Sequence, residues 1–174
     1  MFERETTPAD VLTDAALGAL AGAAATAAMG PLTSYLSRHQ AEPTRRQERS
    51  VSERLGDPPT VKVARKAAAA LATSVPPWRH SLAGNVVHYG FGTFWGAVLG
   101  GLSARWRTLP PGTGVALGIL LWLSMDEAAL PALGLGAKPS DYPRETHVRV
   151  LAAHVFYGIL LDRGLAVLRA AARR

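Results

Sequence analysis

The stretch that decides the fold is residues 81–102, SLAGNVVHYGFGTFWGAVLGGL, which carries no formal charge. As an α-helix it would be about 33 Å long, enough to cross the hydrocarbon core of a bilayer. Within it, small residues and one histidine recur every four residues: Gly84, His88, Gly92, Gly96 and Gly100. Positions four apart lie along one slowly drifting face of a helix. The stretch therefore predicts a membrane helix whose small-residue face lies close to another helix.

Three other segments are apolar enough to predict membrane helices, at residues 11–36, 113–137 and 147–168. The first contains Gly18 and Gly22, a pair spaced four residues apart, and the last contains Gly158 one turn after His154. Small residues at this spacing are typical of close helix packing in lipid. Residues 1–174 therefore predict a single all-α domain, an integral membrane bundle of about four transmembrane helices with Gly and Ala packing.

The chain is basic, with a formal net charge of +6. A polar insert at residues 37–80 holds nine of the basic residues and dilutes the apolar segments, so that the mean hydropathy is only +0.10. Part of the insert, about residues 60–75, has the period of an amphipathic helix, which is typical of a solvated linker or of a helix on an anionic membrane surface. We expect anionic lipid headgroups, and no nucleic acid, as partners of the insert.

Basic residues in short loops mark the cytoplasmic side of a membrane protein. Twelve of the nineteen Lys and Arg residues lie in the insert and in the stretch 138–149. The distribution predicts a multi-pass protein of the bacterial cytoplasmic (inner) membrane with both chain ends outside. The lipid bilayer is then its first partner. The number of small positions favours, in addition, a homo-oligomer or a complex with another membrane protein subunit.

Titratable residues inside the predicted spans are the candidates for chemistry. Asp126 and Glu127 lie near the middle of segment 113–137, and His88 and His154 lie at a similar depth in their own segments. Ionisable groups at such a depth are costly and usually functional. Three interpretations stay open: neutral groups that hold the bundle together, a proton or ion path, and a haem clamped between the two histidines.

Several function classes are excluded. The chain has no cysteine, which rules out disulfides, thiolate metal sites and a cysteine nucleophile. It also lacks the GxSxG, HExxH and P-loop patterns. We therefore expect no metal site and no enzyme, and favour a structural, assembly or accessory-subunit role through helix packing. A proton path and a bis-histidine haem electron carrier are alternatives, and a soluble all-α basic protein is a further one.

The second half of the chain resembles a known family. Pro131-Ala-Leu-Gly134, a short polar loop, Ala-His154-Val-Phe and then Asp162-Arg163 are similar to the pattern of the YagU-like family of small bacterial inner-membrane proteins. The resemblance covers roughly residues 82–168. It implies several membrane helices and a poorly defined function loosely associated with acid tolerance. Asp126 and Glu127 are not part of the shared pattern, so the resemblance assigns them no role.

Overall fold

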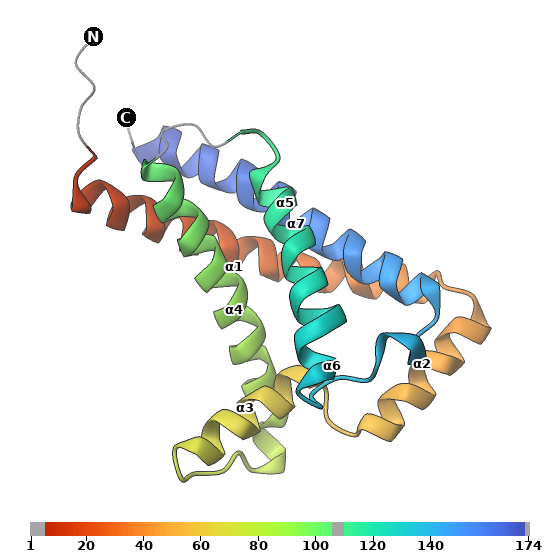
Figure 1. Ribbon diagram of the computed structural model, residues 1–174. Helices are drawn as coiled ribbons and strands as arrows, with labels where there is room; N and C mark the ends of the chain where they lie inside the picture. The colour runs from red at the N-terminus through yellow and green to blue at the C-terminus, as the bar shows by residue number, and fades with distance from the viewer. Residues whose placement is uncertain (1–5, 106–109, 173–174) are drawn as a thin grey trace.

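The computed structural model describes residues 6–105 and 110–172 (Figure 1). These ranges are almost entirely helical and contain no strand. The α-helices are α1 (Pro8–Arg38), α2 (Glu42–Leu55), α3 (Pro59–Ala70), α4 (His80–Arg105), α5 (Thr113–Leu121), α6 (Leu130–Ala132) and α7 (Arg144–Ala172). The remaining elements are two short 3-10 turns, η1 (Pro77–Arg79) and η3 (Pro139–Asp141), and the π-helix η2 (Trp122–Ala129).

Helix α1 begins earlier and ends later than the predicted segment 11–36. Thr7 forms a capping box with Asp10, in which each side chain hydrogen-bonds the backbone N–H of the other residue. Pro8 follows at the first helical position, where a missing N–H costs nothing. At the other end the helix continues through Pro31 to Arg38. The capping box therefore explains the earlier start of the helix, whose apolar middle was predicted from the sequence.

Helix α1 lies between α4 and α7 and packs on both (Figure 1). Its contact with α4 is made by glycine backbones. A Cβ added at Gly22 would lie 2.5 Å from the carbonyl oxygen of Gly92 and 3.0 Å from the Cα of Gly96, and one added at Gly18 would overlap Gly96 and approach Gly100. The three last glycines of the four-residue ladder thus face α1 of the same chain. That such glycines drive helix association in a bilayer stays a prediction.

The other glycine contacts join neighbouring helices in the same way. Gly84, the first position of the ladder, faces Val61 of α3. Between α5 and α7, a Cβ at Gly114 would lie 2.5 Å from the carbonyl oxygen of Gly158, and one at Gly118 would overlap the carbonyl of His154. Gly114 and Gly118 were not singled out in the sequence, although their spacing of four residues carries the same signal.

The polar insert contains two helices where one was predicted. Helix α3 ends at Ala70 rather than near residue 75, because Ala72 adopts a positive φ of 52° and the chain turns there. Helix α2 has no long apolar face from which its position could be predicted. It is fixed by polar contacts instead, among them a 2.8 Å hydrogen bond from Arg149 of α7 to Glu48 and one of 2.9 Å from Gln47 to the carbonyl oxygen of Asp141.

The insert and the two ends of the described chain lie at opposite ends of the bundle (Figure 1). The start of α1 and the end of α7 are joined by an ion pair, in which Arg169 donates two hydrogen bonds of 3.0 and 2.8 Å to the carboxylate of Asp14. Arg169 also contacts the hydroxyl of Ser103 on α4. A single guanidinium therefore ties together the three long helices at this end.

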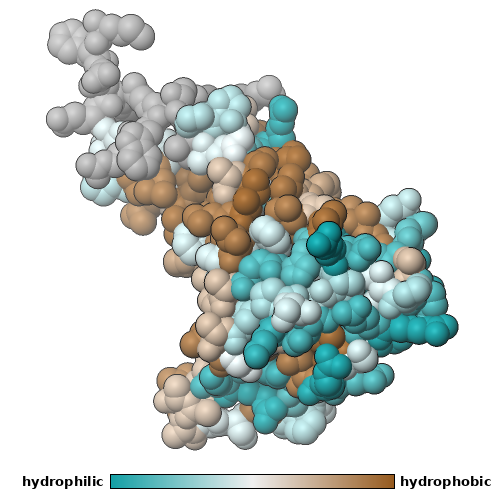
Figure 2. Space-filling model, turned by 45° about the vertical axis from the view of Figure 1, so that its right-hand side comes forward, coloured by the Kyte–Doolittle hydropathy of each residue, from teal (hydrophilic) through white to brown (hydrophobic). Residues whose placement is uncertain are grey.

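Three helical stretches are long and apolar enough to cross a membrane: Pro8–Arg38, Thr113–Ala132 and Arg144–Ala172. Most of their side chains are not buried inside the bundle, and large apolar residues such as Leu20, Leu120 and Val167 are exposed. Figure 2 shows a band of apolar surface beside a hydrophilic end. These findings indicate a membrane protein. Helix α4 is not among the three stretches, since glycine, asparagine and histidine dilute its hydropathy, so a fourth span stays a prediction.

Candidate functional site

A carboxylate–imidazole pair joins η2 to α7. His154 Nε2 lies 3.3 Å from Asp126 Oδ2, and His154 Nδ1 lies 3.0 Å from the carbonyl oxygen of Val150. A carbonyl oxygen only accepts, so Nδ1 carries a hydrogen and donates it to Val150. Nε2 is left to face the carboxylate of Asp126 at the ion-pair distance of 3.3 Å.

A second pair of the same kind adjoins the first. His147 Nδ1 lies 2.6 Å from Glu127 Oε1, and His147 Nε2 lies 3.0 Å from the carbonyl oxygen of Pro139. Because a carbonyl oxygen only accepts, Nε2 donates to Pro139 and Nδ1 faces the carboxylate of Glu127. Consecutive acids on η2 therefore each contact a histidine on α7.

The backbone explains why these two acids have this placement. Residues Trp122–Ala129 form a π-helix, and the N–H of Leu130 donates to the carbonyl oxygen of Met125, five residues back. Pro131 follows at once and has no N–H to donate to the carbonyl of Glu127. Short π-helical stretches are frequent at functional sites. The widened turn and the proline coincide with the only adjacent acids in the apolar segment.

Asp126 lies on the wall of two cavities. The first, which we call the inner cavity, has a volume of about 400 Å³ and is lined mainly by apolar side chains of α1, α3, α4, η2 and α7. Its polar wall includes His88, Asp126, His154 and the buried Tyr157, whose hydroxyl donates a 2.6 Å hydrogen bond to the carbonyl oxygen of Gly92. A cavity of this size lies in the range of small-molecule sites, about 300–1,000 Å³.

The second cavity, which we call the vestibule, has a volume of about 270 Å³ and lies at the insert end of the bundle. Its charged and titratable lining residues are Glu48, Asp126, Glu127, Tyr142, His147 and Arg149. Burial by itself would raise the pKa of Glu48, but hydrogen bonds from Thr146 and Arg149 outweigh it and lower that pKa. Glu48 is therefore ionised at neutral pH. Together the two cavities place Asp126 between a polar compartment and an apolar one.

The structure brings His88, Asp126 and His154 to one cavity and places Glu127 in the neighbouring one. It also assigns a partner to His147, a residue not singled out in the sequence. The signal was present, because His147 lies seven residues before His154 and shares its helix face. Whether these residues form a proton path stays a prediction.

A haem between His88 and His154 would require a rearrangement. Both ring nitrogens of His154 lie near oxygen atoms of the protein, so Nε2 would have to leave Asp126 to bind iron. His88 has no hydrogen-bond partner among the described residues and remains available as a ligand. Within the same described ranges, no group of three or more His, Asp or Glu side chains could hold a metal ion.

Comparison with known proteins identifies a family and no function. A family described as "Protein of unknown function (DUF1440)" matches residues 37–163, which is most of the chain. The match includes the insert, η2 and the greater part of α7, and thus the whole lining of the vestibule and that of the inner cavity except Thr26 and Met29 of α1. No curated protein and no solved structure matches the chain. The narrower resemblance to the YagU-like proteins stays a prediction.

Proposed function

Because the chain belongs to the DUF1440 family of proteins of unknown function, we propose its role from the site alone: it conducts protons within the membrane through the two carboxylate–imidazole pairs. The observation that supports this is the position of Asp126, which lies 3.3 Å from His154 Nε2 and lines both the vestibule and the inner cavity. Carboxylates and histidines at membrane depth are the usual parts of a proton relay.

The sequence of proton transfers follows from the neighbours. A proton that enters the vestibule meets Glu127 and His147 first, and Asp126 is the next residue of η2. From Asp126 it passes to His154, and His88 lines the same cavity. Within each pair the transfer moves a proton between a carboxylate oxygen and an imidazole nitrogen and leaves the charge of the pair unchanged. The proton that passes from one pair to the next adds one positive charge to the pair that receives it.

The path is open on the insert side and closed on the other. Beyond the inner cavity α7 continues with Leu161 and Leu165, which are buried in the apolar core together with Leu121 and Leu99. Among the described residues, these side chains separate the inner cavity from a cavity of about 780 Å³ near the chain ends, which Leu99 and Leu165 also line. Release on that side therefore requires a movement of the helices. The cytoplasmic membrane of a bacterium, with the insert facing the cytoplasm, is the location we propose. The YagU-like resemblance, with its loose link to acid tolerance, agrees with proton handling.

The test is proton flux into liposomes that contain the full-length protein and a trapped pH-sensitive dye, driven by an imposed potassium diffusion potential. We expect Asp126→Asn and His154→Ala each to lower the flux at least tenfold, because each removes one partner of the carboxylate–imidazole pair. Infrared difference spectra between pH 5 and pH 8 should show a carboxyl band that Asp126→Asn abolishes.

The chain supplies a matched control. Asp57 and His80 form a carboxylate–imidazole pair of 3.1 Å outside the predicted spans and outside both cavities. Asp57→Asn should leave the flux unchanged. A wild-type flux equal to that of empty liposomes would refute the proton path and leave an assembly or accessory-subunit role as the function to test, by co-purification of other membrane proteins.

A further inference from the structure

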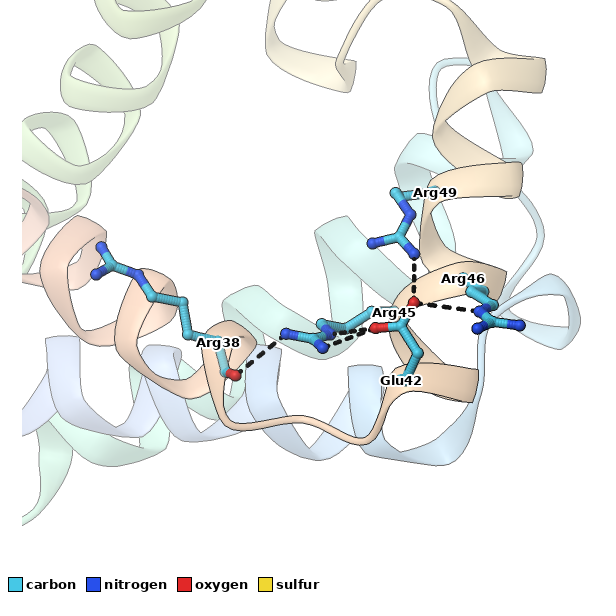
Figure 3. Close-up of polar contacts among 5 residues, drawn as sticks. All are labelled: Arg38, Glu42, Arg45, Arg46 and Arg49. Carbon is cyan, nitrogen blue, oxygen red and sulfur yellow. Dashed lines mark hydrogen bonds and ion pairs between the residues drawn. The ribbon is translucent and has the colours of Figure 1, made fainter.

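A cluster of arginines surrounds one carboxylate at the start of α2 (Figure 3). Glu42 accepts hydrogen bonds of 3.1 and 2.7 Å from Arg45, 3.1 Å from Arg46 and 2.8 Å from Arg49. These bonds lower the pKa of Glu42 to about 2. The bond from Arg46 has the largest effect, followed by those from Arg49 and Arg45. The carboxylate is therefore ionised at every physiological pH and holds the three guanidinium groups in place.

The three arginines differ in how many guanidinium N–H groups remain free after the bonds to Glu42 are made. Arg45 uses Nε and Nη2 on Glu42 and donates through Nη1 to the carbonyl oxygen of Arg38, the last residue of α1 (Figure 3). Arg46 uses only Nε, and Arg49 uses only Nη2. Their side chains are 74% and 56% exposed, and no other acceptor for them occurs among the described residues. Arg45 thus joins α1 to α2, whereas Arg46 and Arg49 present free N–H groups to the surroundings.

The position of the cluster is the headgroup level of the proposed membrane. The apolar helix α1 ends at Arg38, and α2 begins four residues later. Tyr35, in the last turn of α1, is exposed and stacks on His39 at 4.3 Å between ring centroids. Exposed tyrosines are typical of the interface of a bilayer. Figure 2 shows the hydrophilic end of the molecule beside the apolar band.

The helix that carries the cluster is rigidly attached on its other side. Glu48 receives hydrogen bonds from Arg149 and Thr146, and the buried Val51 anchors the same face of α2. These contacts fix the backbone of α2, and the bonds to Glu42 restrain one nitrogen each of Arg46 and Arg49 before a ligand arrives. Because pre-organised donors lose little conformational entropy on binding, a fixed pair of guanidinium groups favours a tetrahedral oxyanion.

We propose that Arg46 and Arg49 form a binding site for the phosphate of an anionic phospholipid at the surface of the membrane. Three guanidinium groups surround one carboxylate, so the cluster retains a positive charge after the internal ion pairs are counted. With Arg38, whose side chain lies apart from the cluster (Figure 3), the stretch 38–49 contains four arginines, and four or more basic residues directly beside a membrane helix are typical of anionic lipid recognition. The sequence predicted anionic lipid headgroups as partners of the whole insert, with the amphipathic stretch 60–75 as one surface for them, and the present proposal names α2 as the site. The proposal does not depend on the proton path.

The test is native mass spectrometry of the full-length protein in detergent with added phosphatidylglycerol, phosphatidylcholine or inorganic phosphate as separate probes. We expect phosphatidylglycerol to bind in preference to phosphatidylcholine. The double variant Arg46→Gln/Arg49→Gln should weaken phosphatidylglycerol binding roughly 30-fold, from the typical contribution of two basic residues near an anionic surface. The variant Arg46→Lys/Arg49→Lys keeps the charge and should recover part of the affinity.

The control is Arg54→Gln/Lys62→Gln, which removes the same charge from two other residues of the insert. It should keep the wild-type affinity for phosphatidylglycerol within a factor of about three, because the lipid binds a defined site and not the overall positive charge of the insert. An equal loss in both double variants would refute a defined site. If Arg46→Gln/Arg49→Gln retains the preference for phosphatidylglycerol, a defined site at these two residues is also refuted. If inorganic phosphate binds as tightly as the lipid, the assignment to a membrane ligand is overturned. Unchanged helical circular dichroism of each variant shows that it has folded.

Discussion

The contact between α1 and α4 can be tested by the same substitution at two glycines of one helix. At Gly96 a Cβ would overlap the carbonyl oxygen of Gly18 and lie 2.8 Å from the Cα of Gly22. At Gly90 a Cβ would meet nothing within 4 Å. Gly96→Ala and Gly90→Ala therefore add the same methyl group to α4 and differ only in what surrounds it.

The expected magnitude follows from two terms. Replacing glycine by alanine inside a helix stabilises it by about 1 kcal/mol, and this term is common to both variants. At Gly96 the two helices must move apart by roughly 1 Å to restore ordinary contact distances, and overpacking of this kind costs about 1–3 kcal/mol. We expect Gly90→Ala to be neutral or stabilising, and Gly96→Ala to be less stable than Gly90→Ala by about 1–3 kcal/mol.

The assay is equilibrium unfolding in mixed micelles of dodecyl maltoside and sodium dodecyl sulfate, followed by helical circular dichroism. Using the difference between the two variants removes the shared propensity term and any common effect of the detergent. If Gly96→Ala unfolds at the same dodecyl sulfate fraction as Gly90→Ala, the backbone contact between α1 and α4 does not contribute to stability and the reasoning is wrong.

Two further predictions concern single polar contacts. Glu48→Gln should lower the free energy of unfolding by about 1–2 kcal/mol at pH 7, because it weakens the charged hydrogen bonds from Thr146 and Arg149. The pKa of Glu48 is lowered in the folded protein, so this stabilisation is fully present above the ordinary value of 4.5 and is lost as the pH falls from there through the lowered value. Thermal unfolding at pH 7 and pH 3.5 should therefore show a smaller difference between variant and wild type at the lower pH. Tyr157→Phe should cost about 1 kcal/mol through the loss of the hydrogen bond to Gly92, measured by the same unfolding assay, and an unchanged midpoint would show that this hydroxyl is satisfied elsewhere.

The long apolar helices were predictable because hydropathy and small-residue spacing are local properties. The segments 11–36, 81–102 and 147–168 each lie within one helix of the structure, α1, α4 and α7. The start of α1 depended on the Thr7 capping box, and its end on residues beyond the apolar stretch. Helix boundaries therefore differed by a few residues where capping, rather than hydropathy, set them.

The candidate site was predictable in composition and not in geometry. The sequence identified Asp126 and His154 as polar residues of neighbouring depth, but it gave no partner to Glu127. A π-helical turn inserts one residue and changes the helical phase by about 100°. Periodicity counted from an α-helix cannot say which way two consecutive acids then point, so the contact of Glu127 with His147 required the tertiary structure.

By itself the sequence determined that the protein is helical, that its segments are apolar enough for a membrane, and which titratable residues those segments contain, because each of these is a property of nearby residues. The tertiary structure alone decided that the glycines of α4 face α1, that Asp126 lies between two cavities, and that α2 is fixed to α7 through Glu48. Those features join residues that are far apart in the chain, and their energies depend on distances of a few ångströms that no spacing along one helix can specify.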